Sequence, residues 1–449
     1  MATLDWVAEA TGGQLIGASA PFTSVTQDTR NLRPGGLYVA LRGERFDGHS
    51  FVRRAASLGA AGALVAEASD SPLPQVQVTD TLAALQVMAR RWLERFDVPV
   101  VAVTGSNGKT TVKQMLAAIL GGVGPTLATA GNFNNHIGLP LTLMRLDGSH
   151  RFAVLEMGAN KPGDIAELVA IAPPRVALIT HAAAAHLAGF GGLDGVARTK
   201  GEIYGGLQSG GTAVINADDR YAAQWAQTAQ GSSQIRFGLD QPADVTASDL
   251  QMSPAATRLT LQIAGRSVAL ELPLSGRHNV MNALAAAAAA HALGISLPQI
   301  AEGLARLEPA PGRLTPRTAD CGAALLDDSY NANPTSLQAA LAVLAQADGK
   351  RWLALGNMNE LGSNAVEAHV EAGRQARAAG VERLFLLGDL AAHAAQGFGE
   401  GAEIADSMDV LCKQVASEIS PQVCLLIKGS RGARMERLVQ ALTLSLIHI

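Results

Sequence analysis

The sequence is poor in cysteine and in aromatic residues, and it has little excess charge of either sign. Its 449 residues include three cysteines, Cys321, Cys412 and Cys424, and only 4% are aromatic. Three scattered thiols form neither a disulfide framework nor a metal-ligand spacing, which is typical of a protein of the reducing cytoplasm. A formal net charge of −4 and few aromatic rings argue against binding to nucleic acid, which needs a basic surface or base-stacking side chains.

Long apolar runs are also missing. The segment Met1–Trp6 has neither the basic region nor the apolar core of a signal peptide. The alanine-rich tract 283–290 is too short to span a bilayer and has polar flanks, which favours a packed helix. We therefore expect a cytoplasmic protein with no membrane insertion. With 48% apolar residues, a chain of this length can build roughly two to four domains.

A glycine-rich turn between an apolar strand and a helix is the strongest signal in the chain. Backbone N–H groups in such a turn cradle phosphate oxygens. The spacing predicts that Lys109 reaches the β and γ phosphates and that the Thr110 hydroxyl ligates Mg²⁺. Val103 stands where the common motif has a glycine, so the loop is a shorter variant. A turn without a ligand is the alternative, and glycine, lysine and two threonines at a helix start favour nucleotide binding. The turn consists of Gly105, Ser106, Asn107, Gly108, Lys109, Thr110 and Thr111.

The chain is predicted to be an α/β protein of three domains. Residues 1–80 are predicted to have short strands and one helix at 51–59, which indicates a small N-terminal α/β domain. Residues 81–308 alternate strands with helices, which predicts a central phosphate-loop domain with a mainly parallel sheet covered on both faces. Residues 309–443 are predicted to form a Rossmann-like unit, and the segment Pro309–Gly312 is predicted to be a hinge that connects it to the central domain. The apolar tail 444–449 is expected to be non-native. The predicted strands are 36–41, 100–104, 152–156, 176–180, 212–216, 323–327, 352–356, 384–387 and 423–428.

Further polar residues follow two predicted strands. Glu156 ends an apolar strand, at the edge of an α/β sheet where ligands gather, and it could hold Mg²⁺ through oxygen. A solvated charge at the strand end is the alternative. His181 and His186 follow the next strand and could ligate metal or merely pack. Lys200 lies in the predicted helix 195–204, and its spacing alone does not separate a functional role from a solvated surface position.

Taken together, these motifs resemble the Mur ligases, ATP-dependent amide-bond synthetases of peptidoglycan precursor assembly. The resemblance extends over nearly the whole chain, and several motifs in the same order are more specific than any one of them. It implies that the N-terminal domain binds the UDP end of the substrate and that the central domain binds ATP. The C-terminal domain would be the ligase domain that completes the active site. The matching segments are Thr104–Thr111, Glu156, His186, Lys200, Gly276–Ala286, Pro311–Arg313 and Asp327–Pro334.

The resemblance also implies a catalytic centre with two Mg²⁺ ions. Thr110 and Glu156 would hold the first ion, and His186 and a carbamylated Lys200 the second. An ammonium cannot ligate Mg²⁺, whereas a carbamate supplies anionic oxygen. Lys109, His186 and Lys200 are therefore the expected catalytic residues.

Other residues are matched to substrate contacts by the same resemblance. Asn282, Arg313 and Asp328 would contact the adenine, phosphate and ribose of ATP; helix packing, a surface charge and a strand-end turn are their alternative roles. The remaining expected substrate contacts are Asp28, Arg30, Asp47, His49, Asn134, Asn135, Asn331 and Lys428.

Within the family, the chain looks like the ligase that joins D-alanyl-D-alanine to UDP-N-acetylmuramoyl-tripeptide. Segments 28–30, 39–49, 131–140, 329–333 and 428–431 carry this similarity, and the Asp-Asn-Pro-Arg motif of the diaminopimelate-adding enzyme is absent. The partners implied are these two substrates, with a monomeric enzyme. His181 departs from the family, which commonly has asparagine there.

Two alternatives remain at this point. Another ligase of the superfamily, including a folate polyglutamate synthetase, would share the ATP site. A phosphate-loop ATPase of unrelated purpose is the second alternative, and it predicts ATP turnover without an amine acceptor.

Overall fold

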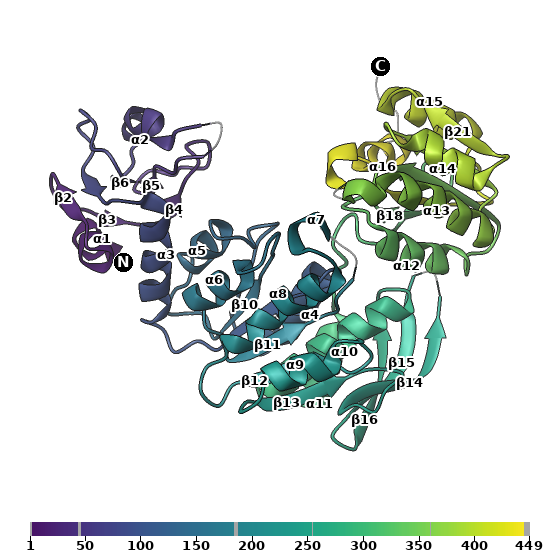
Figure 1. Cartoon of the computed structure of the whole chain (residues 1–449), viewed down its shortest axis with the longest axis horizontal. Helices are drawn as coiled ribbons and strands as arrows, with labels where there is room; N and C mark the ends of the chain where they lie inside the picture. The colour runs from purple at the N-terminus through teal and green to yellow at the C-terminus, as the bar shows by residue number, and fades with distance from the viewer. Residues whose placement is uncertain (1, 44–45, 184–186, 254, 360, 444–449) are drawn as a thin grey trace.

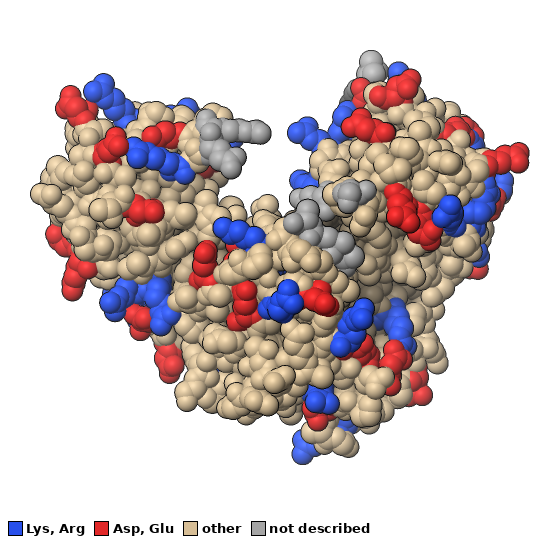
Figure 2. Space-filling view, viewed as in Figure 1, with Lys and Arg blue, Asp and Glu red and all other residues tan. Residues whose placement is uncertain are grey.

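The computed structural model describes residues 2–43, 46–183, 187–253, 255–359 and 361–443, and the tail 444–449 lies outside them. The chain forms three α/β domains in sequence order (Figure 1), so the predicted fold class is confirmed. Figure 2 shows a hollow between the N-terminal and C-terminal domains, above the central one. Within the described part of the chain, none of the helices has the length and hydrophobicity needed to cross a membrane.

The N-terminal domain contains a five-stranded sheet in the order β2-β7-β6-β5-β4. Its strands β4 to β7 run parallel, and β2 joins β7 antiparallel. Helix α3 (Thr81–Leu93) follows and packs on both α1 and α5, which joins this domain to the central one. Asp80 fixes the start of α3, because its carboxylate accepts from the N–H groups of Leu82 and Ala83. The elements are β1 (Ala2–Thr3), α1 (Leu4–Thr11), β2 (Gln14–Ile16), β3 (Pro21–Phe22), β4 (Val25–Thr26), β5 (Leu37–Val39), η1 (Gly48–Phe51), α2 (Val52–Ser57), β6 (Gly62–Val65) and β7 (Gln75–Gln77).

The central domain has a nine-stranded sheet in the order β16-β15-β14-β13-β12-β11-β8-β10-β9. The strands from β9 to β14 run parallel, while β14, β15 and β16 form an antiparallel ribbon at one edge. The carboxyl ends of β8, β10, β11 and β12 therefore meet at one edge of the sheet. The strands are β8 (Val100–Thr104), β9 (Thr126–Ala128), β10 (Phe152–Glu156), β11 (Val176–Ile179), β12 (Thr212–Asn216), β13 (Ser233–Phe237), β14 (Val245–Met252), β15 (Thr257–Ile263) and β16 (Arg266–Leu272).

Helix α10 (Arg277–Ala292) forms the centre of one face of this sheet. Ala285–Ala290 are each exposed by 1% or less, and the helix contacts β11 to β15 as well as α4 and α11. Small side chains allow this close approach of helix and sheet. The other helices are α4 (Lys109–Gly121), α5 (Gly138–Leu143), α6 (Asp164–Ile171), α7 (Leu187–Phe190), α8 (Leu193–Gly205), α9 (Ala222–Thr228) and α11 (Leu297–Ala305).

The C-terminal domain is a six-stranded sheet in the order β17-β18-β22-β19-β20-β21, parallel except for β17. Helices cover both of its faces, as the Rossmann-like prediction required. The exact domain boundaries at residues 80, 308 and 443 stay predictions. The elements are β17 (Thr315–Thr318), β18 (Ala324–Asp328), α12 (Pro334–Leu344), β19 (Lys350–Gly356), η2 (Gly362–Asn364), α13 (Ala365–Ala378), β20 (Arg383–Leu387), α14 (Ala391–Phe398), β21 (Ala402–Ala405), α15 (Met408–Glu418), β22 (Val423–Lys428), η3 (Arg431–Ala433) and α16 (Glu436–Thr443).

Candidate active site

The phosphate loop lies between β8 and α4 and requires glycine at two positions. Gly105 and Gly108 have φ values of +147° and +81°, which other residues rarely adopt. A Cβ atom on Gly105 would lie 1.8 Å from the hydroxyl oxygen of Thr180, and one on Gly108 would lie 2.4 Å from Oδ1 of Asn282. The loop backbone can therefore pass close to Thr180 and Asn282. The first turn of α4 lines a cavity.

That cavity has a volume of about 560 Å³ and lies between the central and C-terminal domains. This volume is in the range of pockets for small ligands. It brings together most of the residues predicted to bind ATP. Its lining includes Ser106, Asn107, Gly108, Lys109, Thr110, Thr111, Glu156, Asn282, Arg313 and Asp328.

Lys109 lies at the base of the phosphate loop. Its ammonium donates a hydrogen bond to the carbonyl of Gly105 at 2.7 Å. Burial lowers the pKa of Lys109; Glu156 opposes this shift and Arg313 adds to it. The side chain lines the main cavity and also a smaller neighbouring cavity of about 370 Å³. The Lys109 side chain therefore lies at the junction of the two cavities.

Glu156 is the acidic centre of the main cavity and is only 3% exposed. One carboxylate oxygen accepts from the Thr110 hydroxyl at 2.9 Å, and the other accepts from the Asn134 side-chain amide at 2.8 Å. Lys113, a residue not predicted from the sequence, places its ammonium 4.0 Å from the carboxylate and donates to the Thr129 carbonyl at 2.8 Å. Lys113 follows Lys109 by four residues on α4, and this spacing places the two lysines on the same face of the helix.

The donor set around Glu156 suits a hard cation. Hydroxyl, amide and carboxylate oxygens are the ligands that Mg²⁺ accepts, and Mg²⁺ in nucleotide sites is usually held by one or two carboxylates together with phosphate oxygens. Among the described residues there is no cluster of three or more histidine, cysteine or acidic side chains. A Mg²⁺ ion held by Glu156 and Thr110 would take its other ligands from phosphate oxygens and water.

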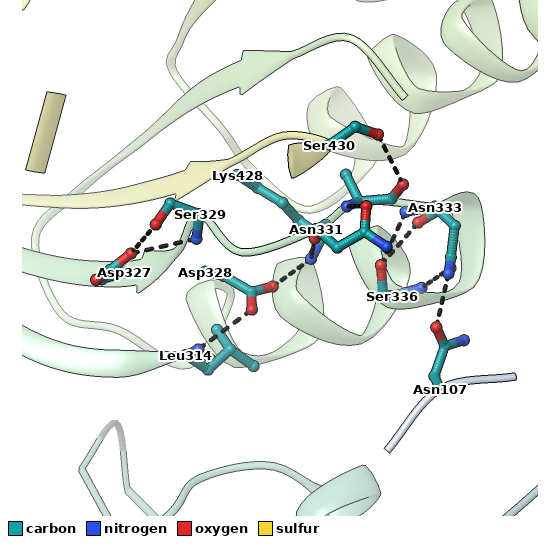
Figure 3. Close-up of polar contacts among 11 residues, drawn as sticks. Asn107, Leu314, Asp327, Asp328, Ser329, Asn331, Asn333, Ser336, Lys428 and Ser430 are labelled. Carbon is teal, nitrogen blue, oxygen red and sulfur yellow. Dashed lines mark hydrogen bonds and ion pairs between the residues drawn. The ribbon is translucent and has the colours of Figure 1, made fainter. Parts of the chain in front are cut away.

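In the described part of the chain, two hydrogen bonds join the C-terminal domain to the phosphate loop. The Arg313 guanidinium donates to the Thr110 hydroxyl at 3.0 Å and lies 4.1 Å above the ring of Tyr330. The Asn333 amide donates to Oδ1 of Asn107 at 2.6 Å (Figure 3). Asn333 was not assigned to the site from the sequence, although it lies in a segment that resembles the family. The C-terminal domain thus reaches the loop through side chains on both sides of Asp328.

Asp328 and Lys428 form a buried ion pair in the same wall of the cavity (Figure 3). The parallel pairing of β18 with β22 places these residues opposite each other. Asp328 also accepts from the N–H of Leu314 at 3.2 Å, and Lys428 donates to the carbonyl of Asn331 at 3.0 Å. Burial raises the pKa of the Asp328 carboxyl, and the Lys428 charge opposes this shift. Three residues predicted to contact substrates therefore lie together, and two of them also stabilise the domain.

We expect the substitution Lys428→Met to destabilise the C-terminal domain by about 3–5 kcal/mol, because it leaves the Asp328 carboxylate buried without its partner. The double variant with Asp328→Asn should recover most of this loss, since neither charge then remains. Calorimetry of the thermal unfolding of both variants tests this, and an unchanged transition in Lys428→Met would contradict it.

Lys200 lines the smaller cavity from α8 and is 5% exposed. Burial, and then the positive charge of Lys109, lower the pKa of Lys200 well below that of an ordinary lysine. More of the amine is therefore neutral at neutral pH, as a reaction with CO₂ requires. Asn134 and Asn135 line the same cavity. His186 lies outside the described residues.

Asn135 also has a structural function. Its side-chain oxygen accepts from the N–H groups of Ile137 and Gly138 at 3.1 Å and 2.8 Å, and so fixes the start of α5.

The four residues predicted in the N-terminal domain line neither of these cavities. Asp28 and Arg30 form an exposed ion pair, with a nitrogen–oxygen distance of 2.6 Å. Asp47 accepts from the backbone N–H of His49 at 2.9 Å and lies 2.6 Å from Nδ1 of its ring, while Nε2 of the ring accepts from the N–H of Ala66 at 2.8 Å. These contacts shape a separate surface, so the structure does not bring the four residues to the phosphate loop.

Comparison with known proteins accounts for all three domains. Family models described as "Mur ligase family, catalytic domain", "Mur ligase middle domain" and "Mur ligase, glutamate ligase domain" match residues 21–93, 103–290 and 312–431. The UDP-N-acetylmuramoyl-tripeptide–D-alanyl-D-alanine ligase of Escherichia coli K12 is 44% identical over 443 residues, 98% of each chain. The enzyme of the same name from Bacillus subtilis 168 is 36% identical and covers 93% of this chain and 92% of its own.

Solved structures agree with these sequence matches. A crystal structure of MurF from Acinetobacter baumannii superposes with a TM-score of 0.90 at 34% identity and covers 97% of both chains. The MurF ligase of Thermotoga maritima in complex with ADP gives a TM-score of 0.83 at 28% identity, over 93% of this chain and 96% of its own. Sequence, fold and domain order agree, and the chain therefore belongs to the Mur ligase family.

Proposed function

We propose that this chain joins D-alanyl-D-alanine to the free carboxylate of UDP-N-acetylmuramoyl-tripeptide, with conversion of ATP to ADP and phosphate. The observation that carries the proposal is the cavity in which Lys109 of the phosphate loop and Arg313 of the C-terminal domain meet. It occurs in a chain that is 44% identical to an enzyme named for this reaction. The product would be a pentapeptide precursor of peptidoglycan, made in the cytoplasm by a monomeric enzyme.

The chemistry requires two anions to approach each other. The tripeptide carboxylate attacks the γ-phosphorus of ATP, ADP leaves, and an acyl phosphate forms. The amine of D-alanyl-D-alanine then attacks the acyl carbon, phosphate leaves, and the amine loses a proton as the amide bond forms. Fixed positive charges must offset the repulsion in the first step. Lys109 and Arg313 are in place for this role, since both line the main cavity.

Magnesium and the carbamate are part of the proposal. Thr110 and Glu156 fit a first Mg²⁺ ion, and a carbamylated Lys200, with His186, would hold a second. The ions would supply positive charge at the phosphate and acyl oxygens. The buried amine of Lys200 supports carbamylation, because a neutral amine attacks CO₂ and loses a proton as the carbamate forms.

The domains divide the substrates among them in this proposal. Residues 1–80 hold the UDP end through Asp28, Arg30, Asp47 and His49, residues 81–308 bind ATP, and residues 309–443 bring in D-alanyl-D-alanine. Asn282 and Asp328 would contact adenine and ribose. The hollow in Figure 2 leaves room for a long substrate between the N-terminal and C-terminal domains.

The direct test is phosphate release by the whole chain with ATP, Mg²⁺ and UDP-N-acetylmuramoyl-tripeptide. We expect rapid release only when D-alanyl-D-alanine is added, with a new amide product seen by mass spectrometry. Single amino acids serve as control acceptors. Preference for a single amino acid would indicate another Mur ligase, and equal turnover without any acceptor would indicate an ATPase of different purpose.

Domain closure gives an independent prediction. We expect the radius of gyration measured by small-angle scattering to decrease when a non-hydrolysable ATP analogue and UDP-tripeptide are both present, because a phosphorylated intermediate needs water excluded. Rotation near Pro309–Gly312 would move the C-terminal domain as a unit. Either ligand alone is the control, and an unchanged radius with both would contradict closure.

A further inference from the structure

The segment 180–183 follows β11 and lies against the phosphate loop. We propose that Ser106 and Asp219 are positioning residues that hold this segment from two sides, and that they thereby keep His181 beside the phosphate loop. The inference rests on the proposed function, since it assigns a purpose to residues around the same ATP site. It also gives Ser106 a different role from the phosphate contact predicted from the sequence.

Ser106 holds the segment from the phosphate loop. Its hydroxyl donates to the carbonyl of Ala183 at 3.1 Å and accepts from the N–H of the same residue at 2.9 Å. Its own N–H donates to the carbonyl of His181 at 2.9 Å. A serine hydroxyl has a single proton to donate, and here that proton is used in the hydrogen bond to the Ala183 carbonyl. Neither donor group of Ser106 is therefore aimed at a phosphate oxygen.

Asp219 holds the segment from the opposite side, just beyond the end of β12. One carboxylate oxygen accepts from the N–H of Ala182 at 2.8 Å, and the other accepts from the N–H of Tyr221 at 2.9 Å. Asn216, at the end of β12, donates to the carbonyl of Thr180 at 2.7 Å. Backbone groups of all four residues of the segment are thus engaged by the phosphate loop or by the end of β12.

The segment places two side chains in the nucleotide cavity. The Thr180 hydroxyl donates to the carbonyl of Asn107 at 2.6 Å, and Nε2 of His181 lies 3.4 Å from the Asn107 amide nitrogen. Burial, and then the charges of Lys109 and Lys200, lower the pKa of His181 to about 4, so its imidazole is neutral at pH 7. A neutral imidazole can donate one hydrogen bond toward a phosphate oxygen without adding charge. Its distance from the phosphate loop is then set by Ser106 and Asp219.

The first experiment compares Ser106→Ala with Ser106→Thr, which keeps the hydroxyl. We expect kcat for phosphate release to fall by roughly 10- to 100-fold in Ser106→Ala, because a displacement of about 1 Å near a reacting centre can slow the reaction by about a hundredfold. The dissociation constant for ADP should change by less than about twofold, since no phosphate contact is lost. Ser106→Thr should recover most of kcat.

The second experiment repeats the measurement with Asp219→Ala and with the double variant. Asp219→Ala should lower kcat in the same way, and the double variant should lose less than the product of the two single effects, because both residues act through one segment. Asp218→Ala is the matched control: its carboxylate instead accepts from the N–H groups of Leu239, Asp240 and Gln241, so kcat should be unchanged.

A readout independent of catalysis is the side-chain NMR signal of His181, assigned with the variant His181→Asn. This signal should shift in Ser106→Ala and in Asp219→Ala but stay in place in Asp218→Ala. Weaker ADP binding by Ser106→Ala, with normal kcat in Asp219→Ala, would overturn the proposal and make Ser106 a phosphate contact. An unmoved His181 signal in both variants would also overturn it. Failure of the proposed function would appear separately, as wild-type protein that forms no amide product.

Discussion

Replacing Lys109 with alanine is expected to lower kcat for phosphate release at least on the order of a hundredfold. The ammonium lies at the junction of the two cavities, where the carboxylate and the γ-phosphate would meet. A fixed charge that stabilises a transition state in a water-poor site contributes several kcal/mol, and its loss reduces kcat accordingly. Steady-state assays at saturating ATP measure this effect directly.

Binding of UDP-tripeptide should change little in the Lys109 variant, because we assign the UDP end to the N-terminal domain. Lys350→Ala is a matched control, since this lysine is exposed at the start of β19, at the end of the strand opposite to the ATP cavity. Near-normal turnover in Lys109→Ala would contradict the assignment of the phosphate loop as the ATP site.

Lys200→Ala is expected to lose activity to a similar extent, and acetate or formate should restore part of it. The reason is that a carbamate supplies oxygen ligands, and a small carboxylate can occupy the space left by the side chain. Added methylamine should not restore activity, because the missing group is an oxygen ligand and not a cation. The comparison of carboxylate and amine rescue therefore separates the two possible roles of this lysine.

The pH dependence of carbamylation has a definite sign. The low pKa of the buried Lys200 amine means that it loses its proton at a lower pH than an exposed lysine, and the neutral form reacts with CO₂. Carbamylation should therefore increase with pH and with added bicarbonate, which ¹³C-bicarbonate NMR can follow. Rescue by amine alone, or nearly full activity of Lys200→Ala, would contradict the carbamate.

Local sequence predicted those parts of the site that depend on neighbouring residues. The phosphate loop lies between a strand and a helix as its glycine spacing required, and the strand that ends at Glu156 has the predicted bounds. Strand ends of a parallel sheet meet at one edge, so this part of the geometry follows from the order of the elements.

Contacts between distant segments could not be predicted in this way. Arg313 and Thr110 are 203 residues apart, and Asn333 and Asn107 are 226 residues apart, so their hydrogen bonds depend on how the domains pack. The antiparallel edge formed by β14 to β16 was not predicted either. Its side chains alternate between buried and exposed positions, which is a weaker signal than the continuous apolar runs of the central strands.

The alanine-rich helix α10 has a consequence for how this sequence can change over evolutionary time. Because the helix is surrounded by the sheet, α4 and α11, a larger side chain at Ala285–Ala290 would have to displace the backbone around it. The same helix carries Asn282, whose side chain fills the space that a Cβ atom on Gly108 would need. Larger side chains along α10 would therefore shift the helix, and this shift would change the shape of the nucleotide cavity. We therefore expect the buried positions of α10 to tolerate far fewer substitutions than the positions of an exposed helix.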